Sequence, residues 1–175
     1  MEPISISKAG EKDIPALVTL INKAYRGETS RKGWTTEADF LNGIRIDKEG
    51  LQDLLKKENA VVLKAFTPDG IILGCVYLEN QGNELYLGML TVEPELQGGG
   101  IGKILLKAAE DHAKSLHLKG IKMNVISLRS ELIEWYRRHG YEMTTERNPF
   151  PTDTRFGEPI RPLEFAVLRK TFDTY

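Results

Sequence analysis

Two features of the sequence predict an α+β (mixed α/β) fold in which helices cover both faces of one sheet. Three apolar segments, at residues 60–66, 71–79 and 84–92, are separated only by short turns, as in an antiparallel meander. The third is followed by a glycine loop, an amphipathic helix and a further apolar segment, which together predict a β-α-β crossover. A sheet with both kinds of connection is mixed, and we expect helices on both of its faces.

The N-terminal part of the chain predicts a short strand followed by three helices. Polar and apolar residues alternate over residues 4–7. Asp13 is the predicted N-cap of a helix to about residue 25, with Pro15 in its first turn and apolar residues at three- and four-residue spacings. We expect a short helix over residues 36–44, and Asp47 begins another that reaches about residue 57.

Turn residues join the three central strands. Residues 67–70 read Thr-Pro-Asp-Gly, in which proline presets the turn and glycine closes it, and residues 80–83 form the next turn. Gly88 interrupts the third strand, and an internal glycine indicates a bulge or a close approach of another backbone.

The C-terminal half predicts alternating helices and strands. The helix after the glycine loop carries apolar residues at three- and four-residue spacings and lysines on its other faces. A second helix stops before Gly140, a C-cap glycine. The remaining expected elements are a strand at 121–126, this second helix at 130–139, a strand at 141–146, a proline-rich loop at 148–162 and a last strand at 163–172.

Composition limits the classes of function. The chain has 175 residues, so we expect a single domain over residues 1–175. The formal net charge of −1 gives no sign of nucleic-acid binding, and no apolar run approaches the roughly 20 residues of a membrane span. Cys75 is the one cysteine, which excludes an intramolecular disulfide and favours a cytoplasmic location. The three histidines lack metal-ligand spacing, so no metal is expected.

The most informative segment is the loop Gln97-Gly98-Gly99-Gly100-Ile101-Gly102 between a strand and a helix. Glycines let a backbone approach an anion, and the first N–H groups of a helix have no partner within it. The loop lacks the Gly-Lys-Ser/Thr ending of a P-loop, and its glycine spacing is not that of the dinucleotide motif. Taken alone, it fits either a phosphate site or a plain connection.

Two motifs make the chain similar to the GNAT acetyltransferase superfamily. The first is Val92-x-Pro94-x-x-Gln97-x-x-Gly100-x-Gly102, and the second, about 34 residues later, is Tyr136-x-x-x-Gly140-Tyr141. The resemblance covers residues 60–147 approximately. It implies about seven strands, splayed between the fourth and fifth, and an enzyme that moves an acetyl group from acetyl-CoA to a primary amine by direct transfer in a ternary complex. An alternative is a non-catalytic acyl-CoA-binding sensor.

The resemblance also implies a cofactor site. The pantetheine arm would bond the third central strand like an added strand, and the N–H of Met89 or Leu90 would face the developing oxyanion. The implied cofactor-binding residues are Leu90, Thr91, Val92, Gln97, Gly98, Gly99, Gly100, Ile101, Gly102 and Lys103. Family members often carry asparagine seven residues before the motif tyrosine, whereas this chain has Arg129. Arg129 could reach a phosphate or the pantetheine arm, or the contact is absent.

Two residues are candidates for proton transfer. Tyr136 resembles the tyrosine that many family members use as general acid toward the sulfur; otherwise it is a core aromatic residue. Glu84 lies on the same strand face as Tyr86 and Gly88 and is a candidate general base; otherwise it is a solvated carboxylate. A site that accepts an already neutral amine needs no base.

The acceptor is expected to bind between the two irregular segments, residues 26–46 and 148–162. Both carry aromatic and basic side chains, and the candidates are Trp34, Arg45, Phe150 and Phe156. These fit either a small acceptor with a carboxylate or a solvated loop with packing aromatics. The expected partner is a small-molecule or peptide amine, and both a monomer and a homodimer are compatible with the sequence.

Overall fold

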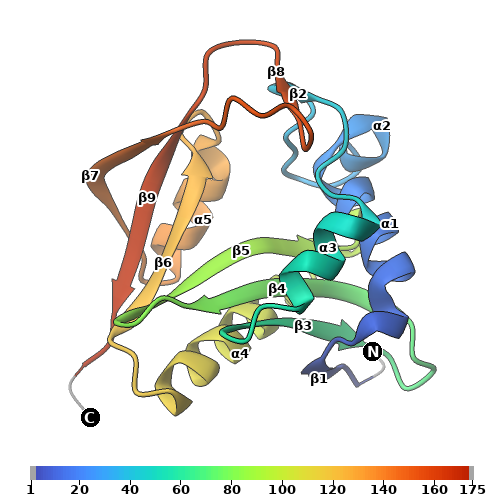
Figure 1. Cartoon of the computed structure of the whole chain (residues 1–175), viewed down its shortest axis with the longest axis vertical. Helices are drawn as coiled ribbons and strands as arrows, with labels where there is room; N and C mark the ends of the chain where they lie inside the picture. The colour runs from blue at the N-terminus through green and yellow to red at the C-terminus, as the bar shows by residue number, and fades with distance from the viewer. Residues whose placement is uncertain (1–2, 174–175) are drawn as a thin grey trace.

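The computed structural model describes residues 3–173 and, within that range, every side chain except that of Glu28, so both ends of the predicted 1–175 domain lie outside the described residues. The main strands are β1 (Ser5–Lys8), β3 (Ala60–Phe66), β4 (Ile72–Asn80), β5 (Glu84–Val92), β6 (Gly120–Ile126), β7 (Glu142–Pro149) and β9 (Glu164–Thr171). They form one sheet in the order β1-β3-β4-β5-β6-β9-β7 (Figure 1). Its β5–β6 pair is parallel and its other pairs are antiparallel, which confirms the mixed sheet.

Helices cover both faces of the sheet. The helices are α1 (Ile14–Tyr25), α2 (Gly27–Ser30), α3 (Lys48–Leu55), α4 (Ile101–Ser115) and α5 (Ser130–Arg138), with short 3₁₀ turns at Glu11–Asp13 and Pro94–Leu96. Leu17 and Leu51, from α1 and α3, pack with Cys75 in one core cluster. Leu105 of α4 and Tyr136 of α5 belong to a second cluster that contains Val76. Adjacent β4 residues therefore face opposite layers, as strand geometry requires.

The predicted interruption of the third central strand is a bulge in β5. Cys75 pairs with Thr91 and Tyr77 with Gly88, so two β5 residues stand opposite Val76 alone. Met89, inside the bulge, has a φ of 50°, an uncommon value for a residue with a side chain.

The sheet opens next to this bulge. β5 pairs with β6 only from Glu84 to Tyr86, opposite residues 120–122, and beyond that point the two strands diverge (Figure 1). The divergence confirms the splay between the fourth and fifth strands. It frees one edge of β5 for other contacts.

The two irregular segments differ from the sequence-based prediction. The expected helix over residues 36–44 is wrong, because only one turn forms there, with the N–H groups of Phe40 and Leu41 bonded to the Glu37 carbonyl. The chain then extends into β2 (Leu41–Asn42), which pairs with β8 (Glu158–Pro159). The predicted 148–162 loop is therefore partly strand, and the pairing joins the two segments above the open part of the sheet (Figure 1).

The two predicted N-cap aspartates differ in role. Asp47 caps α3, since its Oδ1 accepts from the Gly50 N–H at 2.7 Å. Asp13 precedes α1 as expected, but its carboxylate accepts from the Gly10 N–H and from Lys64 instead. Within residues 3–173, none of the helices combines the length and apolar composition that a membrane crossing requires.

Candidate functional site

A cavity of about 410 Å³ lies where β5 and β6 diverge. Its walls come from β5, β6, α5, the end of α1 and the two irregular segments. The aromatic lining residues are Tyr25, Tyr86, Tyr136, Phe150, Phe156 and Phe165, and the charged ones are Arg26, Glu37, Arg45, Arg129 and Asp153. A second space of about 50 Å³, which includes Gln97 in its wall, shares Tyr25, Leu90, Arg129, Leu132 and Tyr136 with the first. The shared residues mark a path from the glycine loop toward the larger cavity.

Two side chains bond to the edge of β5 that β6 leaves unpaired, which we call the free edge of β5. The Tyr25 hydroxyl donates to the Leu90 carbonyl at 3.0 Å, and Gln97 Nε2 donates to the Val92 carbonyl at 3.2 Å. Two strand carbonyls are therefore bonded by side chains where a neighbouring strand would otherwise bond them. An extended ligand could add to this edge as a further strand would. Sequence reasoning missed Tyr25, because its contact with Leu90 spans 65 positions.

The glycine loop is open above its backbone. Gly98 and Gly100 have φ values of 89° and 94°, and a Cβ built on either would meet nothing within 4 Å. Gly100 is the N-cap of α4, so the first N–H groups of that helix have no partner within it. Exposed Lys103 adds a positive charge in the first turn. These features fit a pyrophosphate.

Tyr136 lines both spaces. The residue is 3% exposed, and its ring packs edge-on against Trp135 and Tyr141. Among the described groups, the hydroxyl has no hydrogen-bond partner. Burial raises the pKa of the Tyr136 phenol above its ordinary value, so the group keeps its proton at neutral pH.

Arg129 lies at the junction of the two spaces and is 4% exposed. Its Nη1 donates to Glu37 Oε2 at 3.1 Å and its Nη2 to Thr35 at 2.8 Å. Its Nε is buried without a hydrogen-bond partner among the described residues. The guanidinium is thus held by protein through two nitrogens, and a bound ligand could accept from the third. Arg129 lines the smaller space together with Leu90 and Val92 of β5 and with Gln97 of the glycine loop.

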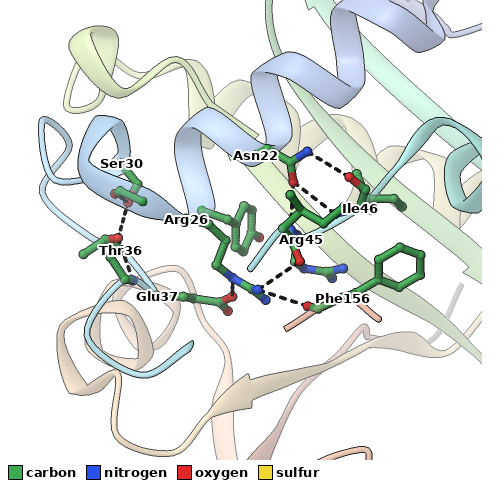
Figure 2. Close-up of polar contacts among 12 residues, drawn as sticks. Asn22, Arg26, Ser30, Thr36, Glu37, Arg45, Ile46 and Phe156 are labelled. Carbon is green, nitrogen blue, oxygen red and sulfur yellow. Dashed lines mark hydrogen bonds and ion pairs between the residues drawn. The ribbon is translucent and has the colours of Figure 1, made fainter. Parts of the chain in front are cut away.

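Glu37 links Arg129 to a second buried arginine. Arg26 Nε donates to Glu37 Oε1 at 2.9 Å, and its Nη1 donates to the carbonyls of Phe156 and Ile44 (Figure 2). One carboxylate therefore pairs with two guanidinium groups, and the three side chains together keep one net positive charge. Arg26 and Glu37 were missed, because no local pattern marks residues that pair across 92 positions, as Glu37 and Arg129 do.

The structure brings three of the four acceptor candidates together. Arg45, Phe150 and Phe156 line the larger cavity. Trp34 is not among its lining residues: its backbone N–H donates to Gln97 Oε1 at 3.0 Å, and its side chain is 46% exposed. Trp34 therefore lies beside the first residue of the glycine loop.

Glu84 lies outside both spaces. It stands where β5 still pairs with β6, and its carboxylate accepts from Arg169 Nε at 3.0 Å. A carboxylate in this ion pair is not placed to take a proton from an amine in the cavity.

Comparison with known proteins agrees with this geometry. A family model described as acetyltransferase (GNAT) domain matches residues 57–143. The amino-acid acetyltransferase of Ralstonia nicotianae is 36% identical over 89 residues, which are 50% of this chain but only 19% of that protein. The fold resembles the ribosomal-protein-S18-alanine N-acetyltransferase of Escherichia coli (TM-score 0.73, 15% identity, 99% and 96% of the chains). It also resembles the PaiA N-acetyltransferase of Thermoplasma acidophilum, solved with coenzyme A (TM-score 0.69, 20% identity, 97% and 99%). The chain belongs to the GNAT acetyltransferase family.

Proposed function

We propose that this protein transfers an acetyl group from acetyl-CoA to a primary amine, by direct attack of the amine on the thioester. The observation that carries the proposal is the free edge of β5 beyond Tyr86, which runs from the glycine loop into a cavity lined by Tyr136. The names of two similar proteins, an amino-acid acetyltransferase and a ribosomal-protein alanine N-acetyltransferase, support an amine acceptor.

The pyrophosphate, the pantetheine arm and the thioester of acetyl-CoA would each meet a different group of this chain. The loop from Gly98 to Lys103 would bind the pyrophosphate through backbone N–H groups, and the edge from Leu90 to Val92 would bind the pantetheine arm. The Arg129 Nε–H would donate to a carbonyl of that arm, which would satisfy the buried nitrogen. The N–H of Met89 or Leu90, at the bulge, would face the thioester oxygen.

The chemical step needs few protein groups. The amine nitrogen attacks the thioester carbon, the carbon–sulfur bond breaks, and the sulfur takes the Tyr136 proton. The nitrogen of the product then loses a proton to water, and water returns a proton to the Tyr136 phenolate. Two carboxylates line the larger cavity: Glu37 is held between two arginines, and exposed Asp153 accepts from the Arg155 N–H. The proposal assigns the role of base to neither. Neighbouring guanidinium groups lower the pKa of a bound amine and favour its neutral, reactive form.

The proposal predicts that Gly100→Val weakens acetyl-CoA binding at least tenfold, about 1.4 kcal/mol, because the side chain enters the space that the phosphates need. Calorimetry with acetyl-CoA measures the effect. Gly82→Val is the matched control: Gly82 also has a positive φ and open surroundings, and it precedes the opposite end of β5. Equal affinity in the two folded variants would reject this placement, and binding without CoA release from any amine would identify a sensor.

A further inference from the structure

We propose that the acceptor amine carries a carboxylate, and that Arg45 binds this group in the larger cavity. The inference rests on the proposed function and names the class of acceptor. Five charged residues line the cavity, and four of them have protein partners: Arg26 and Arg129 share Glu37, and Asp153 accepts from the Arg155 N–H. Among the described side chains, no ion pair or hydrogen bond reaches the Arg45 guanidinium.

Asn22 and Tyr25 of α1 fix the position of Arg45. Asn22 of α1 accepts from the N–H groups of Arg45 and Ile46 at 2.8 and 3.0 Å and donates to the Ile46 carbonyl at 2.8 Å (Figure 2). The guanidinium lies over the Tyr25 ring, 5.5 Å from its centroid. A cation with a fixed backbone and a flat aromatic support is already oriented for a bidentate carboxylate.

The position of Arg45 suits the far end of an acceptor. Arg129 lines both spaces and lies 5.8 Å from the centroid of the same Tyr25 ring, whereas Arg45 lines only the larger cavity. A carboxylate at Arg45 would therefore be held on the acceptor side, while the amine points toward Tyr136 and the thioester.

The size and walls of the cavity limit the rest of the acceptor. A volume of about 410 Å³ suits a small molecule or the end of a short peptide. Tyr86, Phe150 and Phe165 offer apolar walls that favour an aliphatic or aromatic body. Since Arg45 adds an unneutralised positive charge, a second ammonium group on the acceptor is disfavoured.

The test compares acids with their primary amides. CoA release from acetyl-CoA is measured with phenylalanine, 4-aminobutyrate and the dipeptide Ala-Phe, each beside its amide, and with spermidine. Because an amide also lowers the pKa of a nearby amine, the quantity compared is the acid-to-amide ratio of kcat/KM across variants. We expect the ratio for the preferred pair to fall at least tenfold in Arg45→Gln, mainly through the KM of the acid, and less in Arg45→Lys. Arg161→Gln is the matched control, because Arg161 is exposed and lies over the Phe40 ring outside the cavity.

The outcomes separate this inference from the proposed function. An acid-to-amide ratio that is the same in wild type and Arg45→Gln would overturn the inference, as would CoA release from spermidine alone. No CoA release with any amine, by a protein that binds acetyl-CoA, would overturn the proposed function. In that case calorimetry still decides the inference: each acid should bind the acetyl-CoA-loaded wild type more tightly than its amide, and Arg45→Gln should abolish the difference.

Discussion

At the scale of single residues, Tyr136 joins two properties that the sequence left as alternatives. Its ring is part of the core between Trp135 and Tyr141, and its hydroxyl lies at the cavity without a partner among the described groups. The two properties involve different atoms, so a substitution can separate them. A raised pKa keeps the phenol protonated, as a proton donor to a leaving thiolate requires.

Tyr136→Phe should lower kcat about 100-fold and leave the unfolding midpoint and acetyl-CoA affinity nearly unchanged, because only the hydroxyl is lost. Steady-state CoA release and thermal unfolding measure the two effects. Tyr141→Phe is the control: it removes a neighbouring hydroxyl that donates to Glu110, and Tyr141 does not line the cavity. A kcat within threefold of wild type for Tyr136→Phe would assign Tyr136 to packing alone.

The residues that the sequence predicted are those with local signatures. The glycine loop and Tyr136 belong to short motifs with fixed spacing, and Gln97, the first residue of the loop, lines the smaller space together with Tyr136. The Arg26–Glu37–Arg129 network has no such signature, since its pairs form only when distant segments meet. For Trp34 and Glu84, residue type suggested a role, but in the structure they contact Gln97 and Arg169 and line neither space, so their roles stay predictions.

At the scale of elements, periodicity predicted the sheet well and the irregular segments poorly. Helices cover both faces of β3 to β5, so each of these strands is a largely apolar run that its own sequence shows. Residues 36–44 lack such a pattern. Their conformation depends on the pairing of Leu41 with Pro159, which no local rule anticipates. The bulge was predictable because Gly88 marks it within its own strand.

The end of β4 offers an element-scale test. Glu79 accepts hydrogen bonds from Tyr77, Gln81 and Lys57, and these lower the pKa of its carboxyl to about 2, the Tyr77 hydroxyl contributing most. A lowered pKa in the folded state stabilises the protein above the unfolded value of 4.5, and that contribution is lost as the pH falls toward 2. Lys57 follows α3, so the cluster also ties that helix to the sheet.

Glu79→Gln should therefore reduce the free energy of unfolding by on the order of 2 kcal/mol at pH 6, and this difference from wild type should shrink between pH 4.5 and 2. Urea unfolding across that range measures it. Asp69→Asn is a control at a surface turn on the other end of β4. A difference that stays constant with pH would mean that the Glu79 carboxylate contributes nothing through its charge.

At the scale of the whole molecule, one part of the sheet packs in the core and another part, between β5 and β6, lines the cavity. β3, β4 and β5 are held between α4 on one face and α1 with α3 on the other, and two core clusters form there. The opening between β5 and β6 exposes groups that those layers do not cover. α1 belongs to both parts, because Leu17 packs in the core while Tyr25 bonds the free edge of β5. We therefore expect ligand binding to be coupled to the stability of the α1 layer.

Cys75 reports on that coupling. It lies on the β4 face under α1 and α3, is 1% exposed, and burial raises the pKa of its thiol to about 12. At pH 8 the thiolate fraction is then roughly a thousandfold below that of the unfolded chain, before any steric protection is counted. We expect Ellman's reagent to label the native protein at least about a thousandfold more slowly than the protein in urea, at one thiol per chain.

Acetyl-CoA, which has no free thiol, should slow this labelling further. A ligand that binds only the folded state lowers the population of open molecules by the factor 1 + [L]/Kd, so at ten times Kd the rate should fall about tenfold. Gly100→Val, which removes the phosphate contact but leaves the Cys75 layer intact, should show the same basal rate and little protection at that concentration. Fast labelling of the native chain, or a rate indifferent to acetyl-CoA in wild type, would show that the α1 layer opens independently of the binding site.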